Sequence, residues 1–200
     1  MTNRTSLRVW FCLSLATVTG GAAWSAWGLL RVTSAFRNAE ASGLLSVARG
    51  IAEANQLLIV PLYIGVICAF IAVAAYVRAH NAPPISLVLS SSFVALVPVA
   101  LVWLAESLLL DALPTARDGV IANGTLIQRL LYVAVGSGIV LSVLFLFIWA
   151  LRVSPAVAPR RTVAAMALLI ACFVAAAIGL HLRNAWIDDM YARVNSHRGL

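Results

Sequence analysis

The sequence predicts an all-α protein, a polytopic transmembrane helix bundle with five membrane-spanning helices. Of the 200 residues, 62% are hydrophobic and only 10% are charged, and the mean hydropathy is +0.98. Soluble domains carry roughly a quarter charged residues, so the excess apolar surface must face lipid. A helix needs about 20 apolar residues to cross the hydrocarbon layer, and five runs qualify: Val9–Leu30, Leu57–Val77, Ile85–Ala105, Leu130–Leu151 and Val163–Leu182. In lipid such runs form helices because every backbone polar group needs an internal partner.

The first run follows the basic segment MTNRTSLR, which also fits the start of a secretory signal peptide. The apolar run is longer than the usual 7–15 residues of a signal peptide, and it has no clean small-residue cleavage site. The pattern therefore favours a retained first span, with a signal peptide as the alternative.

The second helix should begin before its apolar run. Arg31–Gln56 is the longest polar connection, and within it VARGIAEANQLL has a helical pattern. Arg49 and Glu53 are spaced i, i+4 and can pair on one helix face. We expect this helix to begin near Ser42 and to run through Val77, with its first turns outside the membrane. Pro61 should kink it or leave a carbonyl without its hydrogen bond.

The connections around the third, fourth and fifth spans bear on orientation. Arg78–Pro84 and Arg152–Arg161 are short, proline-containing, and lie on the same side as the N-terminus. That side carries six Arg and no acid, whereas the other side carries eight Arg and all seven acids. The positive-inside rule counts basic residues and does not decide between these sides. The absence of acids favours a cytoplasmic N-terminus.

Charge and cysteine content exclude several function classes. All fourteen basic residues are Arg, scattered in ones and twos without a basic helix face, so nucleic-acid binding is not expected. Cys12, Cys68 and Cys172 lie in different apolar runs, which predicts neither a disulfide framework nor a metal site. No pair of catalytic groups has a convincing spacing within the spans, so no enzyme and no cofactor are expected.

The first two spans carry a recognisable pair of motifs. GAAWSAWGLL is followed by LLSVARGIAEANQLLIVPLYIGVICAFIAVAAY, and together they resemble the two-helix core of the MotA/TolQ/ExbB proton-channel family over about residues 17–76. The matching positions are Trp27-Gly28 and the segment Gly50–Ala54. The resemblance implies a homo-oligomer around a pore that holds single-span partner helices with an intramembrane acidic residue. It also implies a bacterial cytoplasmic membrane location, with the N-terminus inside and the C-terminus periplasmic.

This sequence departs from the family pattern at several positions. Ser25 stands where the family has Thr before its Trp-Gly pair, Leu58 replaces a second Thr, and Pro61 replaces a Gly. The large cytoplasmic domain and the helix before the core are absent, and three other spans follow. We therefore expect a scaffold or channel-like subunit of a proton-motive-force-linked complex. The sequence does not decide whether this subunit conducts protons. The alternative is a non-conducting structural or assembly subunit.

The chain divides into three predicted parts. Residues 1–80 form the hairpin that resembles the family core, and residues 81–161 form a second hairpin that could be a faded repeat of the first. Residues 162–200 form the fifth span and a polar C-terminal tail, in which His181, Asp188, Asp189 and His197 fit a solvated tail better than a metal site.

Three polar residues are candidates for a channel or polar path, namely Ser25, Glu53 and Glu106. Ser25 belongs to a small-residue stripe with Ser14, Gly21 and Gly28, which suits close helix packing or pore lining. Glu53 is either a solvated cap paired with Arg49 or a functional group. Glu106 follows 21 apolar residues and is either interfacial or a functional intramembrane acid. The packing or family-motif residues are Gly21, Trp27, Gly28, Gly50 and Pro61.

Overall fold

The computed structural model describes the backbone of residues 2–38, 44–78, 85–112, 124–150 and 159–198, and side chains within 9–35, 47–75, 88–112, 124–146 and 166–189. In these ranges the chain is entirely helical, which confirms the predicted all-α class. The five helices are α1 (Thr2–Asn38), α2 (Leu44–Arg78), α3 (Ile85–Ala112), α4 (Gly124–Ala150) and α5 (Pro159–Arg198). Each contains a segment long and apolar enough to cross a membrane, so this is a multi-pass membrane protein.

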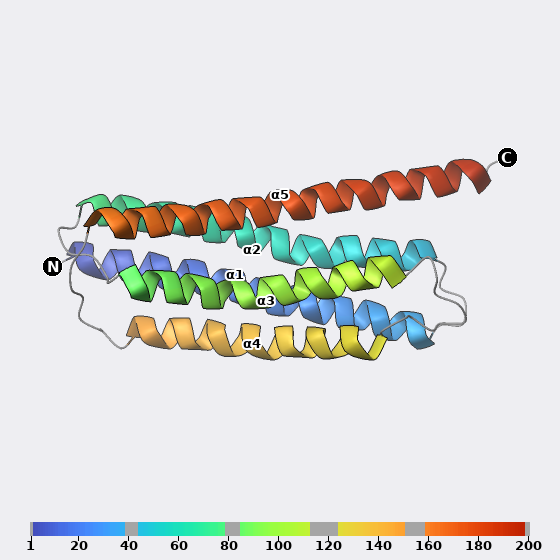
Figure 1. Ribbon diagram of the computed structural model, residues 1–200, viewed down its shortest axis with the longest axis horizontal. Coiled ribbons are helices and arrows are strands. Elements are labelled where there is room, and N and C mark those ends of the chain that lie inside the picture. Colours follow the sequence, from blue (N-terminus) through green and yellow to red (C-terminus); the bar gives the residue numbers. More distant parts are fainter. Residues whose placement is uncertain (1, 39–43, 79–84, 113–123, 151–158, 199–200) are drawn as a thin grey trace.

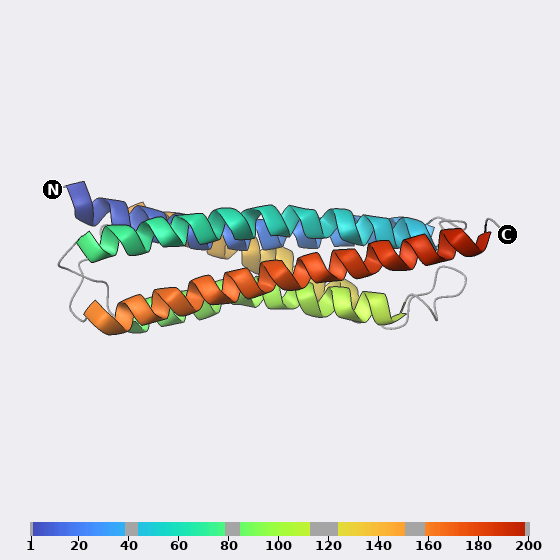
Figure 2. The same cartoon turned by 90° about the horizontal axis from the view of Figure 1, so that it is seen from above.

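Successive helices run antiparallel, so the two ends of the chain lie at opposite ends of an elongated bundle (Figure 1). The most extensive contacts join α1 to α2 and α1 to α4, and α1 also contacts α3. Helix α5 packs on α2 and, less extensively, on α3. Seen from above, α2 lies over α1, while α5 lies along α3 (Figure 2). Accordingly, the first span is the most buried of the five.

The helices extend beyond their apolar runs. Helix α2 begins at Leu44 and is continuous through Gly50–Ala54 into the second span, as expected, and Arg49 Nε lies 3.1 Å from Glu53 Oε1. Helix α5 has 40 residues, or about 60 Å at 1.5 Å per residue. A hydrocarbon layer of about 30 Å leaves part of each helix outside it, where polar residues can continue the helix.

Small residues bring α1 and α2 into close contact. The Ser14 hydroxyl donates to the Gly65 carbonyl at 2.7 Å. A Cβ atom at Gly21 would overlap the ring of Pro61, and one at Gly28 would lie 3.2 Å from the Ala54 Cβ. The α-helix continues through Pro61. The small-residue stripe therefore faces α2 at these three levels, within the chain.

Candidate functional site

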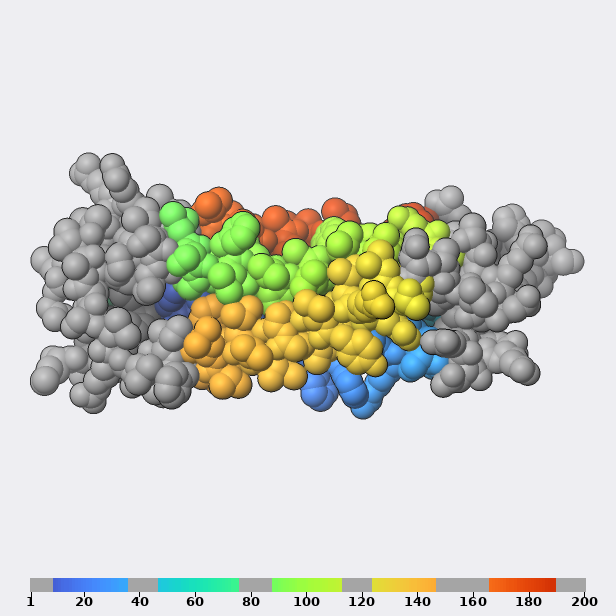
Figure 3. Space-filling model, turned by 60° about the horizontal axis from the view of Figure 1, so that its bottom comes forward, coloured from blue at the N-terminus to red at the C-terminus, as the bar shows by residue number. Residues whose placement is uncertain are grey.

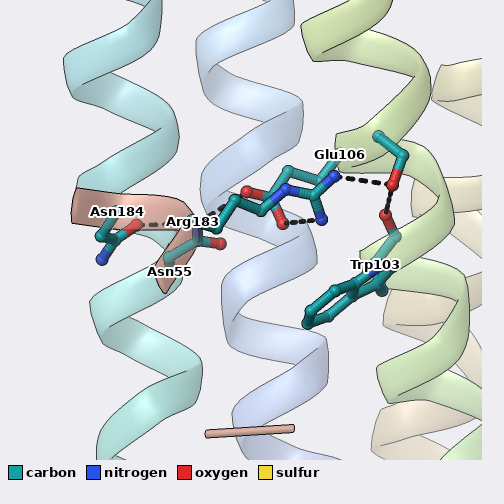
Figure 4. A network of polar contacts seen from close by, with 6 residues as sticks. Asn55, Trp103, Glu106, Arg183 and Asn184 are labelled. Atoms are coloured by element: carbon teal, nitrogen blue, oxygen red, sulfur yellow. Dashed lines mark hydrogen bonds and ion pairs between the residues drawn. The ribbon is translucent and has the colours of Figure 1, made fainter. Parts of the chain in front are cut away.

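A buried carboxylate joins three helices near one end of the bundle. Glu106 of α3 is fully buried. Its Oε1 accepts a hydrogen bond from Asn55 Nδ2 of α2 at 2.7 Å. Its Oε2 forms an ion pair with Arg183 Nη1 of α5 at 3.3 Å (Figure 4). One side chain of α3 thus holds both α2 and α5.

The surrounding side chains extend this contact. Asn55 Nδ2 also donates to Asn184 Oδ1 at 3.0 Å, and Arg183 Nη2 donates to Ser107 Oγ at 2.7 Å. The Arg183 guanidinium lies over the Trp103 ring, 4.9 Å from its centroid, a cation–π contact. We call this set the polar cluster; it consists of Asn55, Trp103, Glu106, Ser107, Arg183 and Asn184 (Figure 4).

The polar cluster keeps unused hydrogen-bonding capacity. Asn55 Oδ1 and Asn184 Nδ2 are buried and have no hydrogen-bond partner among the described residues. Leaving a buried polar group unpaired costs about 1–3 kcal/mol. One acceptor and one donor are therefore available for a small polar species, such as a water molecule, that can reach the interior.

Counting along the apolar runs of the sequence puts the polar cluster toward the membrane boundary opposite the N-terminus. Glu106 is 21 residues from the start of its apolar run at Ile85, and Arg183 is 20 residues from Val163. At 1.5 Å per residue each is about 30 Å from the first boundary, which is the thickness of the hydrocarbon layer. Asn55 lies two residues before the apolar run that begins at Leu57. Aromatic residues of the kind found at membrane interfaces are exposed near this level: Trp27, Trp103, Tyr132 and Trp186.

Glu106 therefore combines features of both interpretations made from the sequence. Its depth is interfacial, but its carboxylate is enclosed by protein instead of being solvated. Arg183 is more accessible, with 16% of its side-chain surface exposed. The arrangement can hold helices together and can stabilise charge, and it leaves the carboxylate shielded from direct contact with bulk water.

The other predicted site residues lie apart from Glu106. Glu53 is exposed and pairs with Arg49. Ser25 is fully buried, and its Oγ has no partner among the described residues. Among the described side chains, no hydrogen bond or ion pair links Ser25 or Glu53 to Glu106. The structure does not join the three predicted polar-path candidates into one chain of contacts.

The family-motif residues mainly make packing contacts. Gly21 and Gly28 face α2 at Pro61 and Ala54, and a Cβ at Gly50 would overlap the side chain of Val32. Trp27 is exposed, and the Arg31 guanidinium lies 5.7 Å from its ring centroid.

Sequence reasoning did not find Asn55, Arg183 and Asn184. Each lies within two residues of the end of an apolar run, at the boundary shared with Glu106. Counting residues from the opposite boundary could have shown that they lie at one depth. It could not have shown that they face one another, because their helices are far apart along the chain.

Two further features complete the description of possible sites. Within the described ranges, no group of three or more His, Cys, Asp or Glu side chains could hold a metal ion. The His181 ring contacts the Tyr63 ring, with 5.9 Å between their centroids. A mostly apolar crevice of about 230 Å³ lies near the N-terminal end of the bundle between α1, α3 and α4, lined by Phe11, Cys12, Leu15, Ser90, Ser91, Val94, Leu144 and Phe145.

Comparisons of the chain with models of known protein families, with curated proteins and with solved structures give no match.

Proposed function

We propose that this chain is a scaffold subunit of a bacterial inner-membrane complex and that it does not conduct protons by itself. It is built on a hairpin that resembles the MotA/TolQ/ExbB core, with a cytoplasmic N-terminus and a periplasmic C-terminus. The observation that carries the proposal is the contact of α1 with α2 at Ser14, Gly21 and Gly28. The small-residue face that the resemblance would offer to a pore is occupied within the chain.

The hydroxyl groups of α1 support this proposal because most of them already bond to protein atoms. Ser14 donates to the Gly65 carbonyl. Thr19 donates to the Leu15 carbonyl at 2.9 Å and lies 2.8 Å from Ser142 Oγ. Ser142 donates to the Ala16 carbonyl at 3.0 Å. A proton path needs polar groups that hold water across the hydrocarbon layer. The hydroxyls of Ser14 and Thr19 instead bond to groups of α2 and α4.

The part of α2 that faces α1 offers few polar groups in place of these α1 hydroxyls. Leu58, which stands at the family's second Thr position, is buried, and so is Leu62 one turn further along. The side chains of both are hydrocarbon. Leu58 and Leu62 therefore offer no hydroxyl to a path through one copy.

The polar cluster suits a scaffold role. It ties α3 and α5 to the hairpin through an ion pair and several hydrogen bonds. A buried acid that is paired within the bundle costs less than an unpaired one. A bundle fixed in this way presents a constant surface to other subunits.

A second candidate function is conduction together with a partner that carries an intramembrane acid. The buried Ser25 hydroxyl, which has no partner among the described residues, and the buried Glu106 carboxylate favour it. In this case the partner supplies the groups that link these two positions.

The decisive experiment uses the purified chain alone, reconstituted in liposomes with an internal pH dye and an applied potential. We expect a proton flux equal to that of empty liposomes, with a protonophore added at the end as the positive control. A flux well above empty liposomes that Ser25→Ala or Glu106→Gln abolishes would contradict the proposal. Mass determination of the complex copurified from native membranes tests the scaffold role separately, and a chain that copurifies with no other subunit counts against it.

A further inference from the structure

The crevice near the N-terminal end of the bundle opens to the outside between α3 and α4. Its floor consists of buried residues of α1 and α4, among them Phe11, Leu15 and Phe145. Its rim carries Val94 of α3 and Leu144 of α4, which are exposed. At this end of the bundle α1 (dark blue) is visible between α3 (green) and α4 (orange) in Figure 3. The crevice is therefore a hollow in the outer surface of the bundle.

The depth of the crevice follows from counting along its three helices. Its lining residues lie two to six residues after the start of the apolar run on α1 and five to nine residues after it on α3. On α4 they lie six or seven residues before the end of the run. At 1.5 Å per residue these positions are about 3–14 Å below the membrane boundary. Within a hydrocarbon layer of about 30 Å, this is the level of the lipid acyl chains.

The lining and the size of the crevice suit a hydrocarbon chain. Five of its eight lining residues have hydrocarbon side chains. Apolar cavities stay dry, and the walls of an empty one lose dispersion contacts. The volume is about 230 Å³, which an α-helix about 10 Å across fills with about 3 Å of its length. The crevice therefore cannot seat a helix of another protein, whereas part of one acyl chain fits it.

The membrane boundary next to the crevice is positively charged. Arg8 directly precedes the apolar run of α1 and lies one helical turn from Cys12 on the same face, and Arg4 lies one turn further out. Helix α3 begins at Ile85 without an acidic residue in its first turn, so the positive end of its dipole lies at this boundary. The N-terminal side of the chain carries six Arg and no acid. Basic sites between membrane helices bind anionic head groups, so this charge favours an anionic lipid.

We propose that the crevice is a binding site for an anionic phospholipid. One acyl chain lies between α3 and α4 on the floor that contains Phe11, Leu15 and Phe145, and the phosphate lies at the level of Arg8 and the start of α3. The bound lipid contacts α1, α3 and α4 together. This site is at the opposite end of the bundle from the polar cluster, and the inference depends on neither the proposed function nor the orientation of the chain.

The first test uses the full chain in vesicles of equal parts phosphatidylglycerol and phosphatidylcholine. A trace of phosphatidylglycerol with a photoreactive diazirine on one acyl chain is added, and labelled peptides are identified by mass spectrometry. We expect adducts concentrated in residues 11–15, 90–94 and 144–145, and about one fifth as many from the matching phosphatidylcholine probe, which is zwitterionic. Labelling spread evenly over the lipid-facing helices, or equal numbers of adducts from the two probes, would overturn the proposal.

The second test fills the crevice. Val94→Phe adds bulk at its rim, whereas Val97→Phe adds the same bulk one turn further along α3, outside the crevice. The two valines are 39% and 40% exposed, so both variants should keep the thermal unfolding of the delipidated chain in detergent. We expect about fivefold fewer crevice adducts in Val94→Phe and no loss in Val97→Phe. Equal labelling of the two folded variants would contradict the inference.

The third test concerns the head group. Arg8→Gln should lower the ratio of phosphatidylglycerol to phosphatidylcholine adducts about fivefold, the factor that corresponds to about 1 kcal/mol for each basic residue near a membrane surface. Arg129→Gln removes the same charge at the other end of the bundle and should leave the ratio unchanged. The same ratio in both variants would show that the charge beside the crevice does not select the lipid, and the inference would be wrong.

Discussion

Arg183 has three different partners in the polar cluster. It forms an ion pair with Glu106, donates to Ser107 and lies over the Trp103 ring. Glu106 depends on two partners, Arg183 and Asn55. The carboxylate is fully buried while the guanidinium is partly exposed, so the two residues should respond differently to loss of the other.

That difference gives a prediction at the ion pair. Arg183→Leu leaves a buried carboxylate without its cation and should lower the free energy of unfolding by about 2–4 kcal/mol, somewhat below the value for fully buried pairs. Glu106→Leu should cost less, because a long arginine side chain can reach the headgroups. The Glu106→Leu/Arg183→Leu chain should lose less unfolding free energy than the sum of the losses in the two single variants. Reversible unfolding in detergent measures all four proteins, and strict additivity would show that the pair is not coupled.

A second residue prediction concerns the hydroxyl that fastens α1 to α2. Ser14→Ala removes the bond to the Gly65 carbonyl and should cost about 0.6 kcal/mol, with an upper limit of about 1.7 kcal/mol for interhelical bonds in membranes. Thr17→Ala is the matched control, because Thr17 bonds to the Leu13 carbonyl of its own helix. An equal loss of stability in both variants would mean that the Ser14 bond adds nothing between helices.

At the scale of the elements, a glycine of α1 and a glycine of α4 have opposite surroundings. Gly21 lets α1 approach the Pro61 ring of α2, whereas Gly136 has open space in front of it. We expect Gly21→Ala to destabilise the monomeric bundle by about 1–3 kcal/mol through overpacking. Gly136→Ala should be neutral or should stabilise it by about 0.5–1 kcal/mol through helix propensity. Thermal unfolding in detergent, at a dilution at which light scattering gives the mass of one chain, compares the two variants, and a larger loss at Gly136 would contradict this assignment.

The helices could be predicted from the sequence, but the polar cluster could not. Each predicted span lies mostly within one observed helix because a long apolar run in lipid has few alternatives to a helix. The sequence predicts a fifth span that ends at Leu182 and a solvated polar tail after it, and the structure continues α5 through this tail to Arg198. Glu106 was recognised as unusual from its position after an apolar run. Its partners Asn55 and Arg183 are 51 and 77 residues away along the chain, and only the packing of three helices decides that they meet.

At the scale of the whole molecule, the antiparallel arrangement brings the end of α2, the start of α3, the end of α4 and the start of α5 to the end of the bundle where α1 begins (Figure 1). We expect this end to be cytoplasmic. Phosphatase reporters fused at His80 and Ala158, which lie outside the described residues, should be inactive, while a reporter fused after Leu200 should be active. Phosphatase activity at His80 and Ala158 would show the opposite orientation and would count against the family resemblance.

The position of Arg183 on the last helix has a consequence for biosynthesis. Glu106 leaves the ribosome 77 residues before its cationic partner, an interval of about 4–15 s at 5–20 residues per second. During this interval α3 carries a carboxylate that can bond to Asn55 of the finished hairpin but has no Arg183. A chain that ends before α5 keeps this state permanently. Completion of the ion pair therefore distinguishes a finished molecule from a truncated one.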